Sequence, residues 1–165
     1  MKRKIVSLLL AITLMVNLLP LSGCGDQNDE EAVTRGEWIT MLSETFGLDS
    51  YTEETPYYSD ITNDSNLFSY VQSAAEWDVL SIFTDDTLEP DEKVTLEEVA
   101  STAAIAAGCD VSESQFDDKG NFDADASINY AVQYGILESD KGLSKKATLE
   151  QCEAALSAAQ SAYLN

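Results

Sequence analysis

The residues of this chain that could carry out chemistry are its carboxylates and thiols, because the sequence has 30 acidic residues, three cysteines and no histidine. Without an imidazole, the commonest general base and proton shuttle is missing. Cys109 and Cys152 therefore lack the partner that usually activates a catalytic thiol. The sequence also contains no glycine-rich phosphate loop, no Gly-x-Ser-x-Gly motif and no zinc-binding spacing. We therefore predict that the protein is not an enzyme.

Paired carboxylates can hydrolyse a glycosidic bond or bind calcium, so the acidic residues need a separate test. Among 30 such residues near pairs are expected by chance, and no motif singles out one pair. The densest run, residues 117–125, lacks both the Asp/Asn order before a glycine and the terminal glutamate of a calcium loop. We interpret it as a solvated loop and predict neither a metal site nor a cofactor. A glycan-cleaving enzyme is one alternative for the function, besides the two non-catalytic hypotheses given below.

The first 23 residues have the organisation of an export signal. Basic residues at positions 2–4 precede an almost unbroken apolar run over residues 5–19, which is typical of a secretory signal. A retained transmembrane helix is the alternative. The run is short for a bilayer, however, and it is interrupted at Asn17 and followed by Pro20.

Residues 21–24, Leu-Ser-Gly-Cys, resemble the lipobox of bacterial lipoproteins. This resemblance implies that Cys24 is lipidated and becomes the N-terminus after cleavage. Since two acyl signals hold a protein stably at a membrane, the mature chain would stay on the outer face of the cytoplasmic membrane without spanning it. Residues 24–32 are then the lipidated cysteine and a polar, flexible tether.

Removal of the signal makes the chain more acidic. It takes away three basic residues and leaves six against 30 acidic ones, so the formal charge changes from −21 to −24. Such a surface repels phosphate backbones and anionic headgroups, which excludes nucleic acid as a partner. Bare anionic wall polymers are also repelled unless a divalent cation or a local basic group mediates the contact.

Three capping patterns predict the starts of three helices. Thr34, Thr95 and Thr148 are each followed three residues later by Glu or Gln, which is the capping-box signature. Gly47 and Gly108 are expected to end the first two helices. Apolar residues at spacings of three and four then define one face of each helix: Trp38, Met41, Leu42, Thr45 and Phe46; Leu96, Val99, Ala100, Ala103, Ala106 and Ala107; Leu149, Cys152, Ala155, Leu156, Ala159 and Tyr163.

A second repeated segment lies between these helices. Residues 74–80 align with residues 131–137 at an offset of 57, and the same offset brings Asp60 onto Asp117. Such periods are typical of repeats that cannot bury their apolar faces alone. No run of alternating strand residues occurs. We therefore predict an all-α fold with a central three-helix bundle and long loops.

The order of these segments resembles the S-layer homology family. Residues 57–108 match best, since Ser59-Asp60-Ile61 precede the Trp77 segment, the turn Leu88-Glu89-Pro90-Asp91, and a helix start at Val94-Thr95. Residues 33–48, with Thr34-Arg35-Gly36-Glu37, resemble half of a preceding repeat, and residues 116–163 resemble a degenerate third repeat. The resemblance implies that residues 33–165 form one pseudo-threefold domain.

In that family, grooves between repeats bind secondary cell-wall polysaccharide through an arginine, a loop aspartate and a tryptophan. The matching positions are Arg35, Asp60 and Trp77. A guanidinium can pair with a sugar carboxylate, and an indole can cover a sugar face. Without a ligand, Arg35 would be an ordinary exposed arginine at a helix start. Trp77 would then be either core or groove wall.

The chain departs from the family pattern in two of its three repeats. Leu96 and Leu149 stand where arginine is expected, and Tyr134 replaces the second tryptophan. Trp38 lies within an apolar face and is expected in the core. Cys109 and Cys152 could form a disulfide outside the membrane. We expect two buried free thiols instead, because small buried cysteines are common.

The sequence therefore supports two hypotheses of different classes. The first is a non-catalytic, lipid-anchored envelope protein that binds secondary cell-wall polysaccharide or supports the envelope, favoured by the joint presence of Arg35, Asp60 and Trp77. The second is a protein-interaction adaptor with an envelope protein as its partner, in which the repeats maintain the fold and the sugar site has decayed. The loss of two signature arginines favours the second.

Overall fold

The computed structural model describes residues 32–112 and 115–164, so the predicted signal, Cys24 and most of the predicted tether lie outside the described residues. The described residues form five helices and isolated β-bridges but no strand, which confirms the all-α prediction. None of these helices is long and apolar enough to cross a membrane. The helices are α1 (Arg35–Phe46), α2 (Phe68–Glu76), α3 (Leu96–Ala106), α4 (Asp125–Gln133) and α5 (Leu149–Tyr163).

The three predicted capping boxes are present at the starts of α1, α3 and α5. In each, the threonine hydroxyl accepts a hydrogen bond from the backbone N–H three residues later, and that residue's side chain accepts one from the threonine N–H. Two backbone donors that a helix start leaves unpaired are thereby satisfied in each case. The boxes join Thr34 to Glu37, Thr95 to Glu98, and Thr148 to Gln151.

Glycine ends α1 and α3 as predicted. Gly47 follows α1 in the left-handed conformation, with φ 69°. Gly108 has φ 103°. The N–H of Gly108 donates to the carbonyl of Ile105, and the N–H of Cys109 donates to the carbonyl of Ala104. This is the Schellman arrangement, which glycine favours because it has no Cβ.

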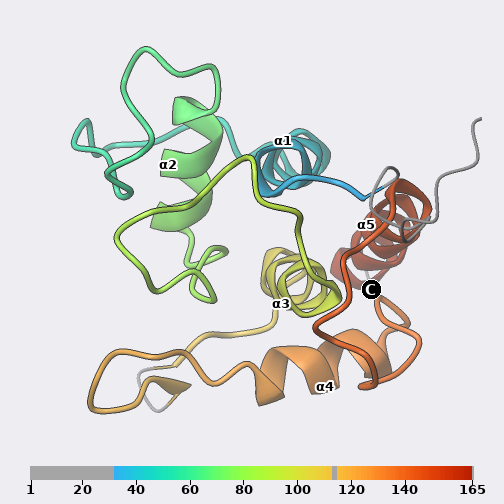
Figure 1. The fold of residues 1–165 in the computed structure, drawn as a ribbon. Helices are drawn as coiled ribbons and strands as arrows, with labels where there is room; N and C mark the ends of the chain where they lie inside the picture. The colour runs from blue at the N-terminus through green and yellow to red at the C-terminus, as the bar shows by residue number, and fades with distance from the viewer. Residues whose placement is uncertain (1–31, 113–114, 165) are drawn as a thin grey trace, which may run out of the picture.

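A ring of three backbone hydrogen bonds lies at the centre of the domain. Val33 donates to Ala147 (3.0 Å), Ala147 to Val94 (2.9 Å), and Val94 back to Val33 (2.9 Å). Each of these buried residues directly precedes a capping threonine, so α1, α3 and α5 leave the ring in equivalent ways. The ring confirms the pseudo-threefold arrangement and its central three-helix bundle, and Figure 1 shows α1, α3 and α5 beside one another.

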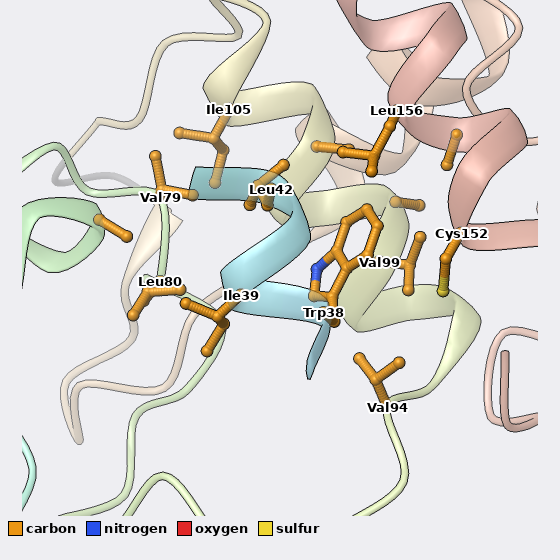
Figure 2. Close-up of a cluster of buried hydrophobic side chains, with 14 of the residues drawn as sticks. Trp38, Ile39, Leu42, Val79, Leu80, Val94, Val99, Ile105, Cys152 and Leu156 are labelled. Atoms are coloured by element: carbon orange, nitrogen blue, oxygen red, sulfur yellow. The ribbon is translucent and has the colours of Figure 1, made fainter. Parts of the chain in front are cut away.

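The core lies between the three central helices, where Trp38 is fully buried (Figure 2). Its indole Nε1–H donates to the Thr102 hydroxyl of α3 at 2.8 Å, so the polar atom of the ring is satisfied inside the core. The second helices of the repeats pack outside the bundle, α2 against α1 and α4 against α3 (Figure 1).

Left-handed backbone positions recur in the two later repeats. Asp78 (φ 59°) follows α2 where Gly135 (φ 72°) follows α4, at the offset of 57 that the sequence predicts. Glu89 (φ 53°) and Gly142 (φ 71°) form a second pair, in the turns that precede α3 and α5. The later repeat thus has glycine at both positions, whereas the earlier repeat has a residue with a side chain.

Replacing Asp78 with glycine is expected to stabilise the domain, since a left-handed conformation is costly for a residue with a Cβ and its exposed side chain forms no hydrogen bond. Glycine makes the unfolded chain more flexible, and this offsets part of the gain. We therefore expect the free energy of unfolding to rise by about 0.5–1 kcal/mol. Thermal denaturation would measure the gain. Gly135→Asp is the matched control and should lower the melting temperature. An unchanged or lower melting temperature for Asp78→Gly would contradict the argument.

Cys109 and Cys152 are both free thiols, which confirms that part of the prediction. Cys152 is fully buried on α5, but Cys109 is only half-buried, so the prediction of two buried thiols is wrong for Cys109. Burial, with a smaller contribution from the charge of Glu153, raises the pKa of the Cys152 thiol to about 12. This thiol therefore stays protonated and unreactive at neutral pH.

Candidate functional site

Arg35, the first residue of α1, forms ion pairs across the bundle. Its Nη2 and Nε donate to Glu98 Oε1 at 2.7 and 3.2 Å, and its Nη1 donates to Glu89 Oε2 at 3.2 Å and to the Leu88 carbonyl at 3.1 Å. Its side chain is 19% exposed, so the alternative of an ordinary exposed arginine is wrong. Burial opposes the charge, but hydrogen bonds to Glu98 and Glu89 and their charges outweigh burial and raise the pKa of Arg35.

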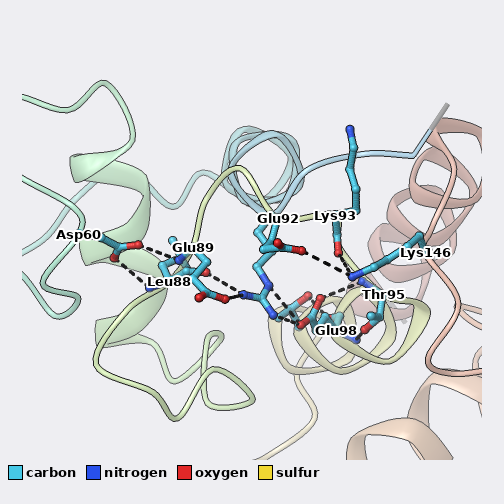
Figure 3. A network of polar contacts seen from close by, with 10 residues as sticks. Asp60, Leu88, Glu89, Glu92, Lys93, Thr95, Glu98 and Lys146 are labelled. Carbon is cyan, nitrogen blue, oxygen red and sulfur yellow. Dashed lines mark hydrogen bonds and ion pairs between the residues drawn. The ribbon is translucent and has the colours of Figure 1, made fainter. Parts of the chain in front are cut away.

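Glu98 connects two helix starts through one carboxylate. Its Oε1 accepts from Arg35, and its Oε2 accepts from the Thr95 N–H at 2.8 Å as part of the capping box. The equivalent side chains, Glu37 and Gln151, form the capping hydrogen bonds, and Glu37 also feels the charge of Lys93. Figure 3 shows Glu98 in this network, and no ion pair of the described residues involves Glu37 or Gln151.

Asp60 lies on the other side of the same turn. Its two carboxylate oxygens accept from the backbone N–H groups of Leu88 (2.9 Å) and Glu89 (2.7 Å), as Figure 3 shows. Arg35 and Asp60 therefore meet at one turn, which Arg35 contacts through the Leu88 carbonyl and Asp60 through the N–H groups. Asp117, the sequence equivalent of Asp60, instead accepts hydrogen bonds within its own loop, from Lys119 and Asn121.

Trp77 follows the last residue of α2 and is 67% exposed, so the core alternative for this residue is wrong. No hydrogen bond or ring contact among the described residues connects it with Arg35 or Asp60. The structure thus brings together two of the three predicted site residues. It leaves the third as an exposed indole on the surface.

A cavity of about 230 Å³ lies between loops that are far apart in the sequence. Its lining residues include four aromatic ones, Tyr57, Tyr58, Phe83 and Phe116, and one hydroxyl residue, Ser81. Tyr57 is 47% exposed and Phe116 37% exposed, so two of these aromatic residues are accessible to solvent.

The ring of Phe83 connects this cavity with the ion-pair network. The guanidinium carbon of Arg35 lies 5.2 Å from the centroid of that ring, within the range of a cation–π contact. The Tyr58 hydroxyl donates to the Phe83 carbonyl at 3.1 Å and fixes the backbone there. Sequence reasoning missed these aromatic residues. Tyr58 and Phe116 nevertheless stand next to the two repeat segments that contain Asp60 and Asp117, which is a signal that the sequence contains.

A larger groove of about 840 Å³ lies between α1 and α5, and Leu149 is one of its lining residues. Three carboxylates, those of Glu37, Glu150 and Glu153, line it together with the amine of Lys93. Among the residues that the structure describes, no cluster of acidic residues and cysteines has the arrangement of a metal site, in this groove or elsewhere. An anionic ligand would meet excess negative charge here.

Comparison with known families shows that residues 57–100 match the family model of the S-layer homology domain. This segment contains Asp60, Trp77, the turn at Leu88 and Glu89, and the first half of α3. No curated protein matches the chain.

Proposed function

Since residues 57–100 belong to the S-layer homology family, whose domains generally bind the cell wall or envelope, we propose that this chain is a lipid-anchored envelope protein that binds wall polysaccharide without catalysis. The family accounts for the coarse role, binding at the cell envelope. The lipid anchor and the polysaccharide are the proposal.

The aromatic cavity is the single observation that supports a sugar ligand most directly. Sugar rings have apolar C–H faces, and aromatic side chains give large, rigid surfaces on which such a face can pack. Tyr57 and Phe116 are exposed, and the Arg35 guanidinium lies within cation–π distance of the Phe83 ring. In this proposal Arg35 and Asp60 position the cavity wall and the adjoining turn, and Trp77 provides a further exposed ring for the same polymer.

The proposed anchor is a lipid on Cys24, supported by the lipobox-like residues 21–24 behind an apolar run. Seven residues, and therefore eight Cα–Cα steps, separate Cys24 from Ala32, where the described domain begins. At full extension such a segment spans at most about 28 Å. The domain would therefore bind wall polymer close to the outer face of the membrane.

Binding to purified cell-wall sacculi tests the proposal. The unlipidated mature chain, residues 25–165, should co-sediment with sacculi in the presence of competing protein, with and without calcium. Tyr57→Ala and Phe116→Ala should each weaken binding by roughly threefold to tenfold, the value of one aromatic packing contact. Tyr163→Ala is the matched control, since Tyr163 is exposed on α5 and does not line the cavity. No sedimentation under any condition, with a folded protein, would refute wall binding.

A protein-interaction adaptor is the second candidate, and one observation favours it. Arg35 is already paired with carboxylates of its own chain, and Leu96 and Leu149 replace the other signature arginines. In that case wall material should not bind, and chemical crosslinking from the lipidated protein at the membrane should capture an envelope protein as its partner instead.

A further inference from the structure

We infer that the aromatic cavity takes an uncharged sugar unit and discriminates against an acidic one. The inference rests on the proposed function, because it specifies which wall polysaccharide the site would bind. Three properties of the molecule support it: the hydrogen bonds that Arg35 already forms, the chemistry of the cavity lining, and the charge around it.

Arg35 has little capacity left for a sugar carboxylate. Its guanidinium carries five N–H donors, and all three nitrogens already donate to Glu98, Glu89 or the Leu88 carbonyl. One positive charge therefore faces two negative ones, and the group as a whole is negative. A ligand carboxylate would have to displace Glu89 or join the two carboxylates, and either change costs Coulomb energy in a partly buried site.

The cavity itself offers surfaces for a neutral ligand. Aromatic rings make up much of its lining, and no lysine or arginine contributes to the described part of it. The amine closest to it in sequence is Lys119, which precedes the lining residue Gly120 and follows Asp117 and Asp118 in an exposed loop. That loop is negative in sum. Hydroxyl groups of a neutral sugar can instead hydrogen-bond to Ser81 and to backbone groups while its C–H face covers a ring.

The charge of the whole chain acts in the same direction. Its formal charge is −21, and every acidic residue lies in the part after Cys24. An acidic polymer approaching this surface is repelled over roughly the Debye length, about 8 Å at physiological salt. A neutral polymer meets no such barrier, so its binding should not depend on salt.

The inference is tested by titrating the unlipidated mature chain with two oligosaccharides of equal length. One consists of neutral N-acetylhexosamine units, and the other has uronic acid at alternate units. Calorimetry at low and high salt should show the neutral oligosaccharide binding at least tenfold more tightly at low salt, with a Kd that salt does not change. Phe116→Ala should weaken it, whereas Tyr163→Ala should not.

The effect of Arg35 pairing is tested by Glu89→Gln, which frees one arginine contact. This variant should improve binding of the acidic oligosaccharide several-fold and leave the neutral one unchanged. Glu92→Gln is the matched control, because the Glu92 side chain is in the same turn and equally exposed but contacts Lys146 and not the Arg35 guanidinium. An equal gain in affinity for the acidic oligosaccharide in both variants would mean that general negative charge, and not the ion pair of Arg35 with Glu89, weakens its binding.

The outcomes separate this inference from the function on which it rests. If sacculi bind and the acidic oligosaccharide binds as tightly as the neutral one at low salt, the inference is overturned while wall binding stands. Wall binding with no affinity for the neutral oligosaccharide overturns it as well. If neither sacculi nor oligosaccharides bind the folded protein, the proposed function fails and the inference fails with it.

Discussion

Replacing Trp38 with alanine is expected to lower the free energy of unfolding by about 3–5 kcal/mol, the usual cost of removing a buried aromatic ring. Trp38 is fully buried between the three central helices, and its indole N–H is bonded to Thr102 of α3. The starts of the three helices are joined by one ring of backbone hydrogen bonds. The helices therefore cannot easily move into the cavity that the missing indole would leave. Urea denaturation of residues 25–165, followed by circular dichroism, would measure the loss.

Two controls show whether this loss comes from the core. Thr102→Val keeps the volume but leaves the indole N–H unpaired, and it should cost about 1–3 kcal/mol. Trp77→Ala removes a ring that is 67% exposed and should change the free energy of unfolding by no more than about 0.5 kcal/mol. Similar losses from Trp38→Ala and Trp77→Ala would be incompatible with the described core.

Replacing Glu98 with alanine should have the second-largest effect. The variant loses a helix cap, worth about 1 kcal/mol. It also leaves Arg35 with a single, largely exposed carboxylate partner, and breaking a fully buried pair costs about 3–5 kcal/mol. Because the Arg35 and Glu98 side chains are 19% and 12% exposed, solvent reduces this second cost. We expect a total loss of about 2–4 kcal/mol in the free energy of unfolding.

The pseudo-threefold arrangement provides a matched control for the capping part. Gln151 caps α5 as Glu98 caps α3 but forms no ion pair, so Gln151→Ala should cost only about 1 kcal/mol. The double variant Arg35→Leu with Glu98→Gln reproduces the pair Leu96 and Gln151 found one repeat later. The free energy of unfolding that it loses should be smaller, by about 1–3 kcal/mol, than the sum of the losses in Arg35→Leu alone and Glu98→Gln alone. Strict additivity would show that the ion pair does not couple α1 with α3.

The starts of the helices could be predicted because capping is local. A threonine and a Glu or Gln three residues later satisfy each other's backbone donors whatever lies elsewhere in the fold, so Thr34, Thr95 and Thr148 mark helix starts in the sequence alone. The ends at Gly47 and Gly108 follow from the same kind of reasoning, since a left-handed residue is needed there. The spacing of apolar residues likewise identified Trp38 as core.

The candidate site depends on contacts that no local pattern contains. Arg35 pairs with Glu98, 63 positions later, and the partner is selected by how α1 meets α3 across the central ring. A sequence pattern identifies which face of a segment is apolar but not which surface covers that face, and so it left the exposure of Trp77 open. The aromatic cavity is assembled from three loops whose meeting depends on the stacking of whole repeats. The sequence by itself therefore determined the capped starts of α1, α3 and α5 and the resemblance of residues 57–100 to the S-layer homology family. Only the tertiary structure decided that Arg35 pairs with Glu98 and Glu89 and that Phe83 lies beside its guanidinium, because these contacts result from packing between segments distant in sequence.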